Sequence, residues 1–368
     1  MTAPVPDRRP LPPADHIGKI ACLMINGIGD VICATPAIAA LKDRYPRAQL
    51  SVIVRPHLRG LLERHPVVDR VLSYEVGSRW KRLVYLGQLR REHFDLWVDL
   101  HMPTFNTVSS NGRDFVRNAL LMIAAGARYR LAYGMPALRP FLTHAVPIPD
   151  RAKLSRDNIA DTTAELIDPS ARRRHQKFVA ISDADRAWGQ AALPASGSPR
   201  IALFFGSRQS ADLWSDRKIL EFLALLAVRL PDAEWVLIGG PFEAAMVQRL
   251  EPQWSKLAAP RIHNYINQST FGQTAALLQR CQAYVGTDSG PTHIADACGI
   301  PIVALFSRKN YPKIWRPISR RATVLSHQVD CSPCFLANCP VGNKCMELIA
   351  PEEVLAALLE IMPPQVGA

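Results

Sequence analysis

The sequence predicts an α/β protein built from two doubly wound parallel sheets. Both halves of the chain alternate short apolar strands with helices of roughly ten to fifteen residues, the pattern of βαβ units. The alternation is interrupted at 182–200 by a segment that ends in Pro, Ser and Gly, and it then restarts. The length of 368 residues also fits two domains of roughly 100–200 residues each.

In the first half, the strand IACLMI is apolar throughout, as expected for a strand buried on both faces, whereas QLSVIVR alternates. The helix that begins PAIAAL has helical spacing and ends at a proline. The expected strands are 20–25, 49–55, 69–75 and 94–101, and the expected helices are 36–46, 58–66, 82–93 and the core helix 119–127.

In the second half the same alternation predicts a second sheet. The expected strands are 201–207, 234–240, 283–288 and 301–307, and the expected helices are 218–231, 242–252, 271–281, 291–299 and 351–362. Ligands of open parallel sheets bind beyond the carboxyl ends of the strands, so we expect the functional residues in the loops that follow the strands.

Composition shifts set the expected domain boundaries. We predict a disordered arm at 1–16, an N-terminal domain at 17–185, a linker at 186–199, a C-terminal domain at 200–350, and a C-terminal helix and tail at 351–368. The first residues contain no apolar h-region, which predicts a cytoplasmic protein whose eight cysteines are mostly reduced. No apolar run approaches the roughly 18–20 residues of a membrane-spanning helix.

The formal net charge of +12 favours an anionic partner, although basic charge can also serve solubility alone. A nucleic-acid-binding protein would concentrate its basic residues in one stripe interleaved with aromatic residues. Lys and Arg are instead scattered through both halves, so we expect no nucleic-acid partner.

The stretch NGIGDVICATPAIAAL places a glycine turn between the first strand and its helix. A dinucleotide fingerprint would need glycine at Ile32, so this stretch does not match one. Asp30 lies where the helix begins, and its negative charge would repel a phosphate there. Asp30 is therefore either a cap of the helix or a group with a chemical role.

The stretch GTDSGPTHIADACG predicts a phosphate site in the second half. Asp288 or Ser289 can cap a helix, Pro291 suits its first turn and Gly299 ends it. Free N–H groups and the positive end of the helix dipole would then meet an anion, which the small Ser289 and Gly290 let approach closely. An ordinary capped helix is the alternative.

These stretches, together with CSPCFLANCPVGNKCMELIAPEEV, resemble the heptosyltransferases of glycosyltransferase family 9, which build the inner core of lipopolysaccharide. Their order and spacing match from Lys19 to Met362, and the sequence is heptosyltransferase II-like. The resemblance implies a GT-B fold, in which two Rossmann-like doubly wound domains face each other across a cleft. The acceptor would bind the N-terminal domain and the nucleotide sugar mainly the C-terminal one.

The resemblance further implies an inverting transfer of heptose from ADP-heptose to an anionic glycolipid acceptor, with Asp30 as the general base. A positioned base contributes roughly 10²–10⁴-fold, because an acceptor hydroxyl is otherwise a poor nucleophile. The implied enzyme works peripherally at the cytoplasmic face of the inner membrane and needs no catalytic cofactor. A family-like transferase with another donor or acceptor, and a non-catalytic sugar-nucleotide binder, remain the alternatives.

By the resemblance, the donor is bound by loops of the C-terminal domain. Members of the family carry a hydroxyl pair and a lysine in the first loop, where Ser207 and Trp214 match but Asp212 replaces the lysine. Either Arg208, Arg217 or Lys218 then supplies the cation, or the donor differs. The expected donor-binding residues are Ser207, Arg208, Asp288, Ser289, Gly290, Pro291, Thr292 and His293.

The acceptor is expected against polar loops of the N-terminal domain. The loop after the strand 94–101 is unusually polar, and its cations suit a substrate with carboxylates and phosphates. The expected acceptor-binding residues are Gly29, His101, Arg113 and Arg117, with Arg55 and Arg59 as further candidates.

A cysteine cluster near the C-terminus has the spacing C-x2-C-x4-C-x5-C. Four thiols in one loop suit a structural zinc or iron ion, but the spacing is tighter than in common zinc motifs. Heptosyltransferase II-like sequences share this cluster, so it also marks a subgroup. Reduced thiols and a redox-labile pair are the alternatives for Cys331, Cys334, Cys339 and Cys345.

Overall fold

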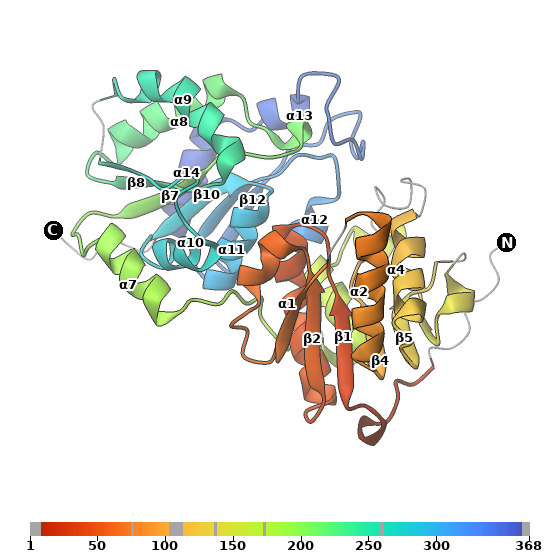
Figure 1. Cartoon of the computed structure of the whole chain (residues 1–368). Coiled ribbons are helices and arrows are strands. Elements are labelled where there is room, and N and C mark those ends of the chain that lie inside the picture. The colour runs from red at the N-terminus through yellow and green to blue at the C-terminus, as the bar shows by residue number, and fades with distance from the viewer. Residues whose placement is uncertain are drawn as a thin grey trace. The chain divides into compact units, whose positions relative to one another are not determined.

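The chain folds into two compact units, Met1–Lys177 and Phe178–Ala368, each built on its own parallel sheet (Figure 1). The computed structural model describes residues 9–74, 77–102, 113–135, 138–171, 174–257 and 261–362. Within these ranges, no helix has the length and apolar character that crossing a bilayer requires.

Over the described residues, the sheet of unit 1 has six strands in the order β3-β2-β1-β4-β5-β6. Its strands are β1 (Lys19–Leu23), β2 (Gln49–Val54), β3 (Arg70–Ser73), β4 (Leu96–Asp99), β5 (Tyr129–Tyr133) and β6 (His144–Val146). Its α-helices are α1 (Ile28–Arg44), α2 (Arg79–Arg91), α4 (Arg113–Ala124), α5 (Arg151–Leu154) and α6 (Ile159–Ile167). Its 3₁₀ turns are η1 (Ala14–His16), η2 (Pro56–Leu61), η3 (Arg139–Phe141) and η4 (Pro169–Ala171).

Unit 2 repeats this topology, with six strands in the described order β12-β11-β10-β7-β8-β9. Its strands are β7 (Arg200–Phe204), β8 (Glu234–Leu237), β9 (Ile262–Asn264), β10 (Ala283–Thr287), β11 (Ile302–Leu305) and β12 (Ala322–Leu325). Its helices are α7 (Asp183–Ala192), η5 (Ser210–Asp212), α8 (Asp216–Arg229), α9 (Pro241–Trp254), α10 (Phe271–Leu278), α11 (Gly290–Cys298), α12 (Pro312–Trp315), α13 (Lys344–Glu347) and α14 (Pro351–Ile361).

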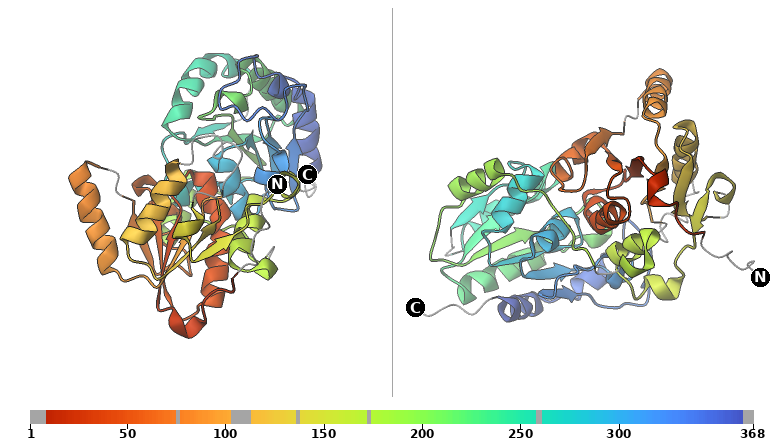
Figure 2. Two further views of the ribbon diagram at one scale, coloured as in Figure 1. Left: turned by 90° about the vertical axis from the view of Figure 1, so that its right-hand side faces the viewer. Right: turned by 90° about the horizontal axis from the view of Figure 1, so that it is seen from below.

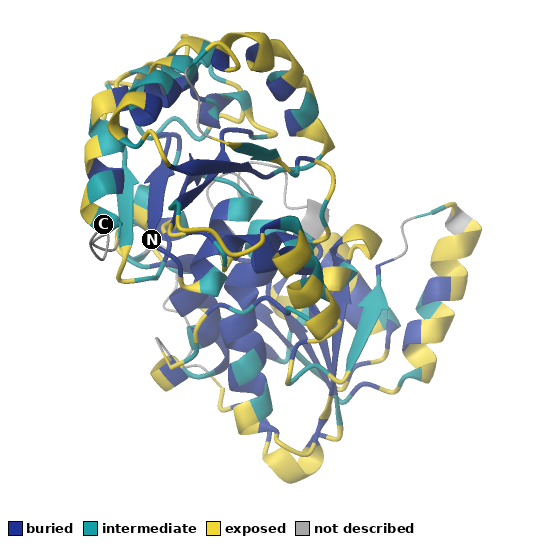
Figure 3. Cartoon of the chain, turned by 90° about the vertical axis from the view of Figure 1, so that its left-hand side faces the viewer, coloured by how far each residue is buried: buried dark blue, intermediate teal, exposed yellow. Residues whose placement is uncertain are grey.

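The chain direction decides which face of each sheet a helix covers. In unit 1, the connection from β1 to β2 and the connection from β3 to β4 run in opposite directions across the sheet. Because parallel crossovers are right-handed, α1 and α2 lie on opposite faces. Most residues of the central strands β1, β2 and β4 are buried (Figure 3), since α2 and α4 cover one face of the sheet and α1, packed on α6, covers the other.

Helix α1 begins eight residues earlier than the predicted helix 36–46, so Pro36 lies inside it. Proline has no N–H to donate to the carbonyl of Ile32, four residues before it. The hydroxyl of Thr35 donates to that carbonyl instead, at 2.7 Å. The predicted helix 58–66 is also different, because the chain there forms only the short 3₁₀ turn η2.

The predicted disordered arm is wrong for its described part. Leu11 is buried, and Tyr45 of α1 donates its hydroxyl hydrogen bond to the carbonyl of Pro12 at 3.0 Å. One buried leucine and this contact hold the segment against α1. Residues 1–8 lie outside the described ranges.

The predicted linker 186–199 is also wrong, because α7 occupies its first half and the two units divide at Lys177 and Phe178. Ser182 and Asp185 cap α7 with reciprocal hydrogen bonds, as a capping box does. The helix packs on α10, where Gly189 lies against Ala276. The Pro/Ser/Gly segment therefore follows a helix of unit 2 and does not join two domains.

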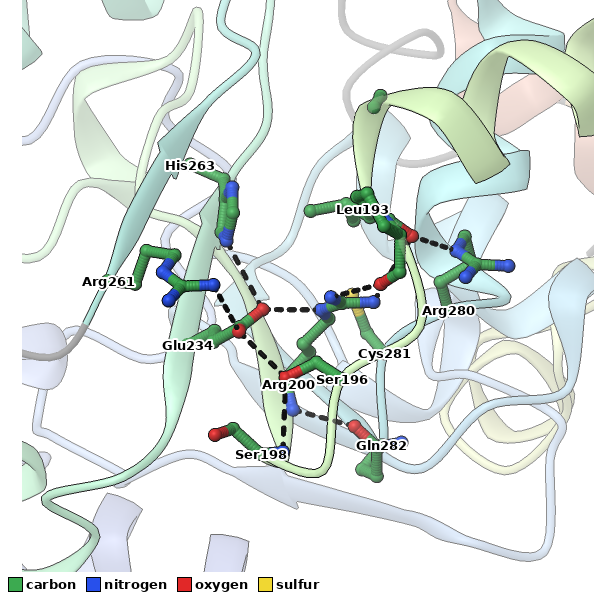
Figure 4. Close-up of polar contacts among 12 residues, drawn as sticks. Leu193, Ser196, Ser198, Arg200, Glu234, Arg261, His263, Arg280, Cys281 and Gln282 are labelled. Carbon is green, nitrogen blue, oxygen red and sulfur yellow. Dashed lines mark hydrogen bonds and ion pairs between the residues drawn. The ribbon is translucent and has the colours of Figure 1, made fainter.

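A buried ion pair fastens this segment to the sheet of unit 2 (Figure 4). The guanidinium of Arg200 donates to Glu234 at 2.6 Å and to the carbonyls of Leu193 and Pro194 at 3.3 and 2.5 Å. Ser196 donates to the other oxygen of Glu234 at 2.9 Å. The segment 193–199 therefore has the composition of a linker but is fixed at both ends, by α7 before it and by the bonds to Glu234 after it.

We expect Glu234→Gln to flatten the loss of stability in acid. Burial raises the pKa of Glu234, but the hydrogen bonds from Arg200 and Ser196 and nearby positive charge outweigh burial and hold the pKa below its ordinary value. The unfolded chain therefore takes up the proton first, below about pH 4.3. The stability that this carboxylate contributes is complete above that pH and is lost as the pH falls through the folded pKa.

Thermal unfolding of both proteins between roughly pH 5 and pH 3 measures this difference. Glu251→Gln, at an exposed position of α9, is the control and should follow the wild type. Parallel declines of wild type and Glu234→Gln would contradict the expectation.

Candidate active site

Each sheet reverses its winding at one point, between β1 and β4 in unit 1 and between β7 and β10 in unit 2. Doubly wound sheets bind ligands at such a point, in the crevice beyond the carboxyl ends of the two strands. The predicted residues Asp30 and His101 follow β1 and β4. The predicted residues Ser207, Arg208 and 288–293 follow β7 and β10.

Asp30 lies in the first turn of α1, beside the end of β1. Its carboxylate accepts hydrogen bonds from the N–H of Gly27 at 3.0 Å and from the side chain of Asn26 at 3.4 Å. It therefore caps α1, as one of the two interpretations of the sequence expected. As a whole residue, Asp30 is half-buried in unit 1.

Burial raises the pKa of Asp30 above its usual range, against the hydrogen bonds from Gly27 and Asn26 and the charge of His101. A raised pKa makes the ionised carboxylate a better proton acceptor than an exposed aspartate. Perturbed carboxyl groups at a ligand-binding edge are typical of catalytic acids and bases.

His101 is buried beside the same strand end, and neither of its ring nitrogens has a hydrogen-bond partner within the described chain. Its ring stacks on Phe115 with 4.6 Å between the ring centroids. Asp99 fixes the backbone here by accepting from the N–H of His101 at 3.0 Å, and Asn118 holds Asp99 at 2.9 Å. Burial raises the pKa of Asp99, against the charge of His101.

Buried polar atoms are normally hydrogen-bonded, so an unpartnered imidazole next to a carboxylate indicates a place for a polar ligand. Asp99 and Asn118 were not predicted from the sequence. Asp99 ends an apolar strand at its carboxyl end, and this position was the available signal.

The other predicted acceptor residues lie in different surroundings. Gly29 lies beside Asp30 in α1, and Arg117 is exposed with its guanidinium 5.7 Å from the ring centroid of Tyr74. Arg113 begins α4, but its side chain and the loop 103–112 lie outside the described part of the chain.

Two further arginine candidates are engaged in the structure. Arg59 donates to Glu63, to the carbonyl of Val71 and to Ser73, so its charge is already paired. Arg55 is exposed and uses its Nε on the carbonyl of Ile25 at 2.5 Å.

In unit 2, the helix α11 begins at Gly290 beside the end of β10, as predicted. The hydroxyl of Ser289 makes no capping hydrogen bond, and the first N–H groups of a helix have no partner within it. The hydroxyl of Thr287 donates to the carbonyl of Gly206 at 2.6 Å and joins this strand end to the loop after β7. The N-terminus of α11 thus offers N–H groups and a positive dipole end to an anion.

Not every predicted donor residue has a group to offer. Pro291 has no N–H, and the N–H of Thr292 donates to the carbonyl of Ser289 at 3.1 Å. The hydroxyl of Thr292 is buried and donates to the carbonyl of Thr287 at 2.6 Å. His293 is buried with its ring against Trp315, at 6.0 Å between centroids. Thr292 and His293 are therefore buried behind the start of α11, and Ser289 and Gly290 supply the N–H groups that a donor could reach.

The loop after β7 holds Ser207, whose hydroxyl accepts from the N–H of Gln209 at 3.0 Å, and the exposed Arg208. Glu243 of α9, which the sequence did not reveal, reaches this loop: a Cβ on Gly206 would collide with it. Burial raises the pKa of Glu243, against the N–H of Gly240 and the charge of Arg208. Its only signal was a glutamate three residues after a glycine that begins a helix.

Asp212, which replaces the lysine expected from the resemblance, does not face a ligand as an unpaired charge. It is buried and paired with Lys309, and Ser307 donates to it at 2.5 Å. Lys309 also donates to Gln209 in the same loop at 2.5 Å. The negative charge of Asp212 is therefore balanced inside unit 2 by a lysine from the segment after β11.

Of the alternatives named for the lysine, Arg217 pairs with Glu221 and Glu347, and Lys218 lies in the first turn of α8. Trp214 is a core residue that donates from its ring N–H to the carbonyl of Ile349 at 3.3 Å. Arg208 remains the exposed cation of this loop.

The cysteine cluster lies in the segment between β12 and α14, and its structural metal ion remains a prediction. Among the described residues, no group of three or more His, Cys, Asp or Glu side chains is placed to hold one. The sulfur of Cys345 accepts from the N–H of Arg308 at 3.4 Å, and that of Cys339 accepts from Asn343 at 3.3 Å. Burial raises the pKa of Cys345, and the neighbouring thiols of Cys339 and Cys334 raise it further, so these three cysteines lie near one another.

Comparison with known proteins gives a match to one family model, that of glycosyltransferase family 9 (heptosyltransferase), over residues 112–345. Lipopolysaccharide heptosyltransferase 3 of Escherichia coli is 23% identical over 303 residues, covering 79% of this chain and 84% of that protein. Lipooligosaccharide heptosyltransferase 2 of Haemophilus ducreyi is 22% identical over 327 residues, covering 83% and 88%.

Among solved structures, ADP-heptose lps heptosyltransferase II of E. coli superposes with a TM-score of 0.73 at 21% identity, covering 93% of this chain and 98% of that one. E. coli heptosyltransferase WaaC with ADP-2-deoxy-2-fluoro heptose gives a TM-score of 0.64 at 15% identity, covering 93% and 99%. These similarities confirm the predicted fold class of two doubly wound α/β domains.

Proposed function

Since this chain belongs to glycosyltransferase family 9 (heptosyltransferase), as the sequence motifs predicted, we propose that it transfers heptose from ADP-heptose to a lipopolysaccharide inner-core acceptor. The observation that carries the assignment of roles is Asp30, which lies at the binding edge of unit 1 and has a pKa that burial raises. Two similar structures are those of an ADP-heptose lps heptosyltransferase and of a heptosyltransferase with ADP-2-deoxy-2-fluoro heptose, which supports ADP as the nucleotide.

In the proposed reaction, Asp30 takes the proton of the acceptor hydroxyl as its oxygen attacks the anomeric carbon of the heptose. The bond between that carbon and the diphosphate oxygen breaks, and ADP leaves. Attack from the face opposite ADP inverts the configuration without an enzyme nucleophile. The step needs no metal ion or other cofactor, since proton removal and charge stabilisation are both available from side chains and backbone.

Charge that develops on the diphosphate would be met in unit 2. The N–H groups of Ser289 and Gly290 lie at the start of α11, and Arg208 is the exposed cation of the neighbouring loop. Fixed donors aimed at developing charge are worth roughly 10²–10³-fold each in acyl transfer, and the same physics applies here.

The acceptor is proposed to bind in unit 1, with His101 hydrogen-bonded to it. The two ring nitrogens of His101 have no other partner in the described chain, and Arg117 supplies positive charge nearby. Carboxylates and phosphates of an inner-core glycolipid are the anionic groups that such residues would recognise. We place the enzyme at the cytoplasmic face of the inner membrane, where such a glycolipid would present its sugars.

Thermal denaturation with ADP, UDP, GDP and CMP, and then with their sugar conjugates, tests the donor. A ligand that binds only the folded chain stabilises it by about 2.7 kcal/mol at 100 times its Kd. We expect ADP and ADP-heptose alone to raise the melting temperature, and ADP release to require a core acceptor. Selectivity for UDP or GDP would replace the donor but keep the fold, and binding without turnover on any acceptor would indicate a non-catalytic binder.

A further inference from the structure

Helix α2 carries a second apolar stripe on the side that faces away from the core. Tyr85 and Leu89 of this helix are buried against the sheet. Trp80, Leu83 and Val84 lie at helical spacing on the opposite side, with 73%, 60% and 46% of their surface exposed. A helix that only covers a sheet needs one apolar stripe, so the outer stripe has no role in the fold.

Helix α4 repeats this arrangement. Met122 is buried, whereas Val116, Leu120 and Ile123, spaced four and three residues apart, are 38%, 53% and 39% exposed. The sequence predicted this helix as part of the core, and only one of its sides is. Helices α2 and α4 lie side by side on the same face of the sheet (Figures 1 and 2).

We call these two stripes, formed by Trp80, Leu83, Val84, Val116, Leu120 and Ile123, the α2–α4 surface. Single exposed apolar residues are ordinary on proteins, but large contiguous apolar areas mark interaction sites. Of the eleven large apolar side chains that are exposed in the described chain, these six lie on two neighbouring helices. Figure 3 shows α2 as a mostly exposed helix at the right of the view.

Basic residues surround the α2–α4 surface. Lys81, Arg82, Arg90 and Arg91 of α2 are exposed, none forms an ion pair within the described residues, and α2 contains no acidic residue. Arg128, just after α4, is exposed as well. In the described chain, helix α2 thus carries unpaired positive charge and one of the two apolar stripes.

We propose that the α2–α4 surface is a docking site for an anionic lipid bilayer, with the aromatic and aliphatic side chains among the acyl chains and the basic residues on the headgroups. Apolar side chains flanked by Lys and Arg are the composition of interfacial amphipathic helices. Each basic residue near an anionic surface adds roughly fivefold to binding, about 1 kcal/mol. A second copy of the chain suits the site less well, since two such basic surfaces would repel each other.

The choice of a bilayer as the partner rests on the proposed function, which gives the enzyme a membrane glycolipid as acceptor. The apolar stripes and the basic residues are observations independent of that function. Lipid binding and transfer to a soluble, delipidated core acceptor are therefore measured separately. Failure of the transfer assay alone would leave the docking surface standing.

Vesicle flotation with the full chain is the first test. Vesicles of three parts phosphatidylethanolamine to one part phosphatidylglycerol should carry the wild type with them, and phosphatidylcholine vesicles should carry roughly tenfold less or lower. The triple substitution Trp80→Ser, Leu83→Ser and Leu120→Ser should reduce flotation at least about tenfold. The matched control substitutes three exposed apolar residues of unit 2, Val228→Ser, Phe242→Ser and Leu348→Ser, and should float as the wild type does.

The contribution of charge has its own pair of variants. Lys81→Glu, Arg90→Glu and Arg91→Glu together should weaken binding by roughly 100-fold or more. The control reverses three exposed basic residues of unit 2, Arg229→Glu, Lys256→Glu and Arg320→Glu, with the same change in net charge. Equal losses in both variants would show that net charge alone binds the lipid and would overturn the proposal.

Insertion is read from tryptophan fluorescence. Phosphatidylglycerol brominated on its acyl chains should quench the wild type, and Trp80→Phe, which keeps an aromatic ring, should lose most of that quenching while still floating. Absence of wild-type binding to the anionic vesicles would overturn the proposal, as would binding unaffected by the α2–α4 substitutions. A wild-type dimer that these substitutions dissociate, without lipid binding, would assign the surface to a second copy instead.

Discussion

Asp30→Asn is expected to lower the turnover number for heptose transfer by roughly 10²–10⁴-fold, because it removes the proposed base and leaves its geometry. The amide oxygen of asparagine can still accept the hydrogen bond that Gly27 donates to Asp30. The cap of α1 is thus largely kept, and the melting temperature should change little. The measurement is ADP release at saturating donor and acceptor, with the heat of unfolding measured alongside.

Asp185→Asn is the matched control for this variant. Asp185 holds the same position in α7, where it accepts from the N–H of Ser182 at 2.9 Å. It shares the capping role of Asp30 and lies outside the proposed site. We expect its turnover to equal that of the wild type, and Asp30→Asn turnover within tenfold of the wild type would remove Asp30 from the chemistry.

The pH profile adds a second readout of the same residue. A base must be ionised to act, and the pKa of Asp30 is raised by burial. The acid limb of kcat/KM should therefore fall at a pH above the ordinary aspartate value of about 3.9. An acid limb at or below that value would contradict the assignment.

Lys309→Met is expected to lower the melting temperature of unit 2 by roughly 6–20 °C. The substitution leaves Asp212 buried without its partner, which costs about 3–5 kcal/mol. Each kcal/mol corresponds to roughly 2–4 °C in a unit of this size. Both side chains are almost wholly buried, at 6% and 3% exposure, so little water can replace the lost charge.

The double variant Asp212→Asn, Lys309→Met tests whether the loss of stability comes from the unpaired charge of Asp212. With both charges gone, we expect it to recover much of the lost stability, because the cost comes from one unpaired charge. Lys256→Met, at an exposed position of the same unit, is the control. Additive losses in the double variant by calorimetry would mean that Asp212 and Lys309 do not act as a pair.

Much of the fold could be predicted because the central strands are long apolar runs between clear glycine and proline signals. The strands β1, β2, β7, β10 and β11 all lie within predicted ranges or overlap them closely. The strands β6, β9 and β12 were not predicted. They are short and lie at or near sheet edges, and β9 contains His263 and Asn264 in place of an apolar pattern. Such strands form because a neighbouring strand offers hydrogen bonds, which a local pattern does not record.

The same distinction applies to the site. Asp30 and the start of α11 were predictable, because a turn and a cap are local signals. Glu243 and Lys309 were not, since Glu243 reaches the loop after β7 from helix α9 and Lys309 reaches it from the segment after β11, 97 residues from Asp212. For the cysteine cluster, the spacing predicted a structural metal ion, and this stays a prediction: within the described chain no three side chains are placed as its ligands.

The winding of the two sheets has a consequence for the chain as it is synthesised. In each sheet, the strand that is synthesised first takes a central position. In unit 1, β1 acquires its second neighbour only when β4 has been made, about 70 residues later. At roughly 5–20 residues per second, β1 keeps one unpaired edge for roughly 4–15 seconds on the ribosome. The same delay separates β7 from β10. The binding edge of each unit is therefore completed by a strand that arrives late, so the nascent chain is most exposed to wrong strand pairing at its future active sites.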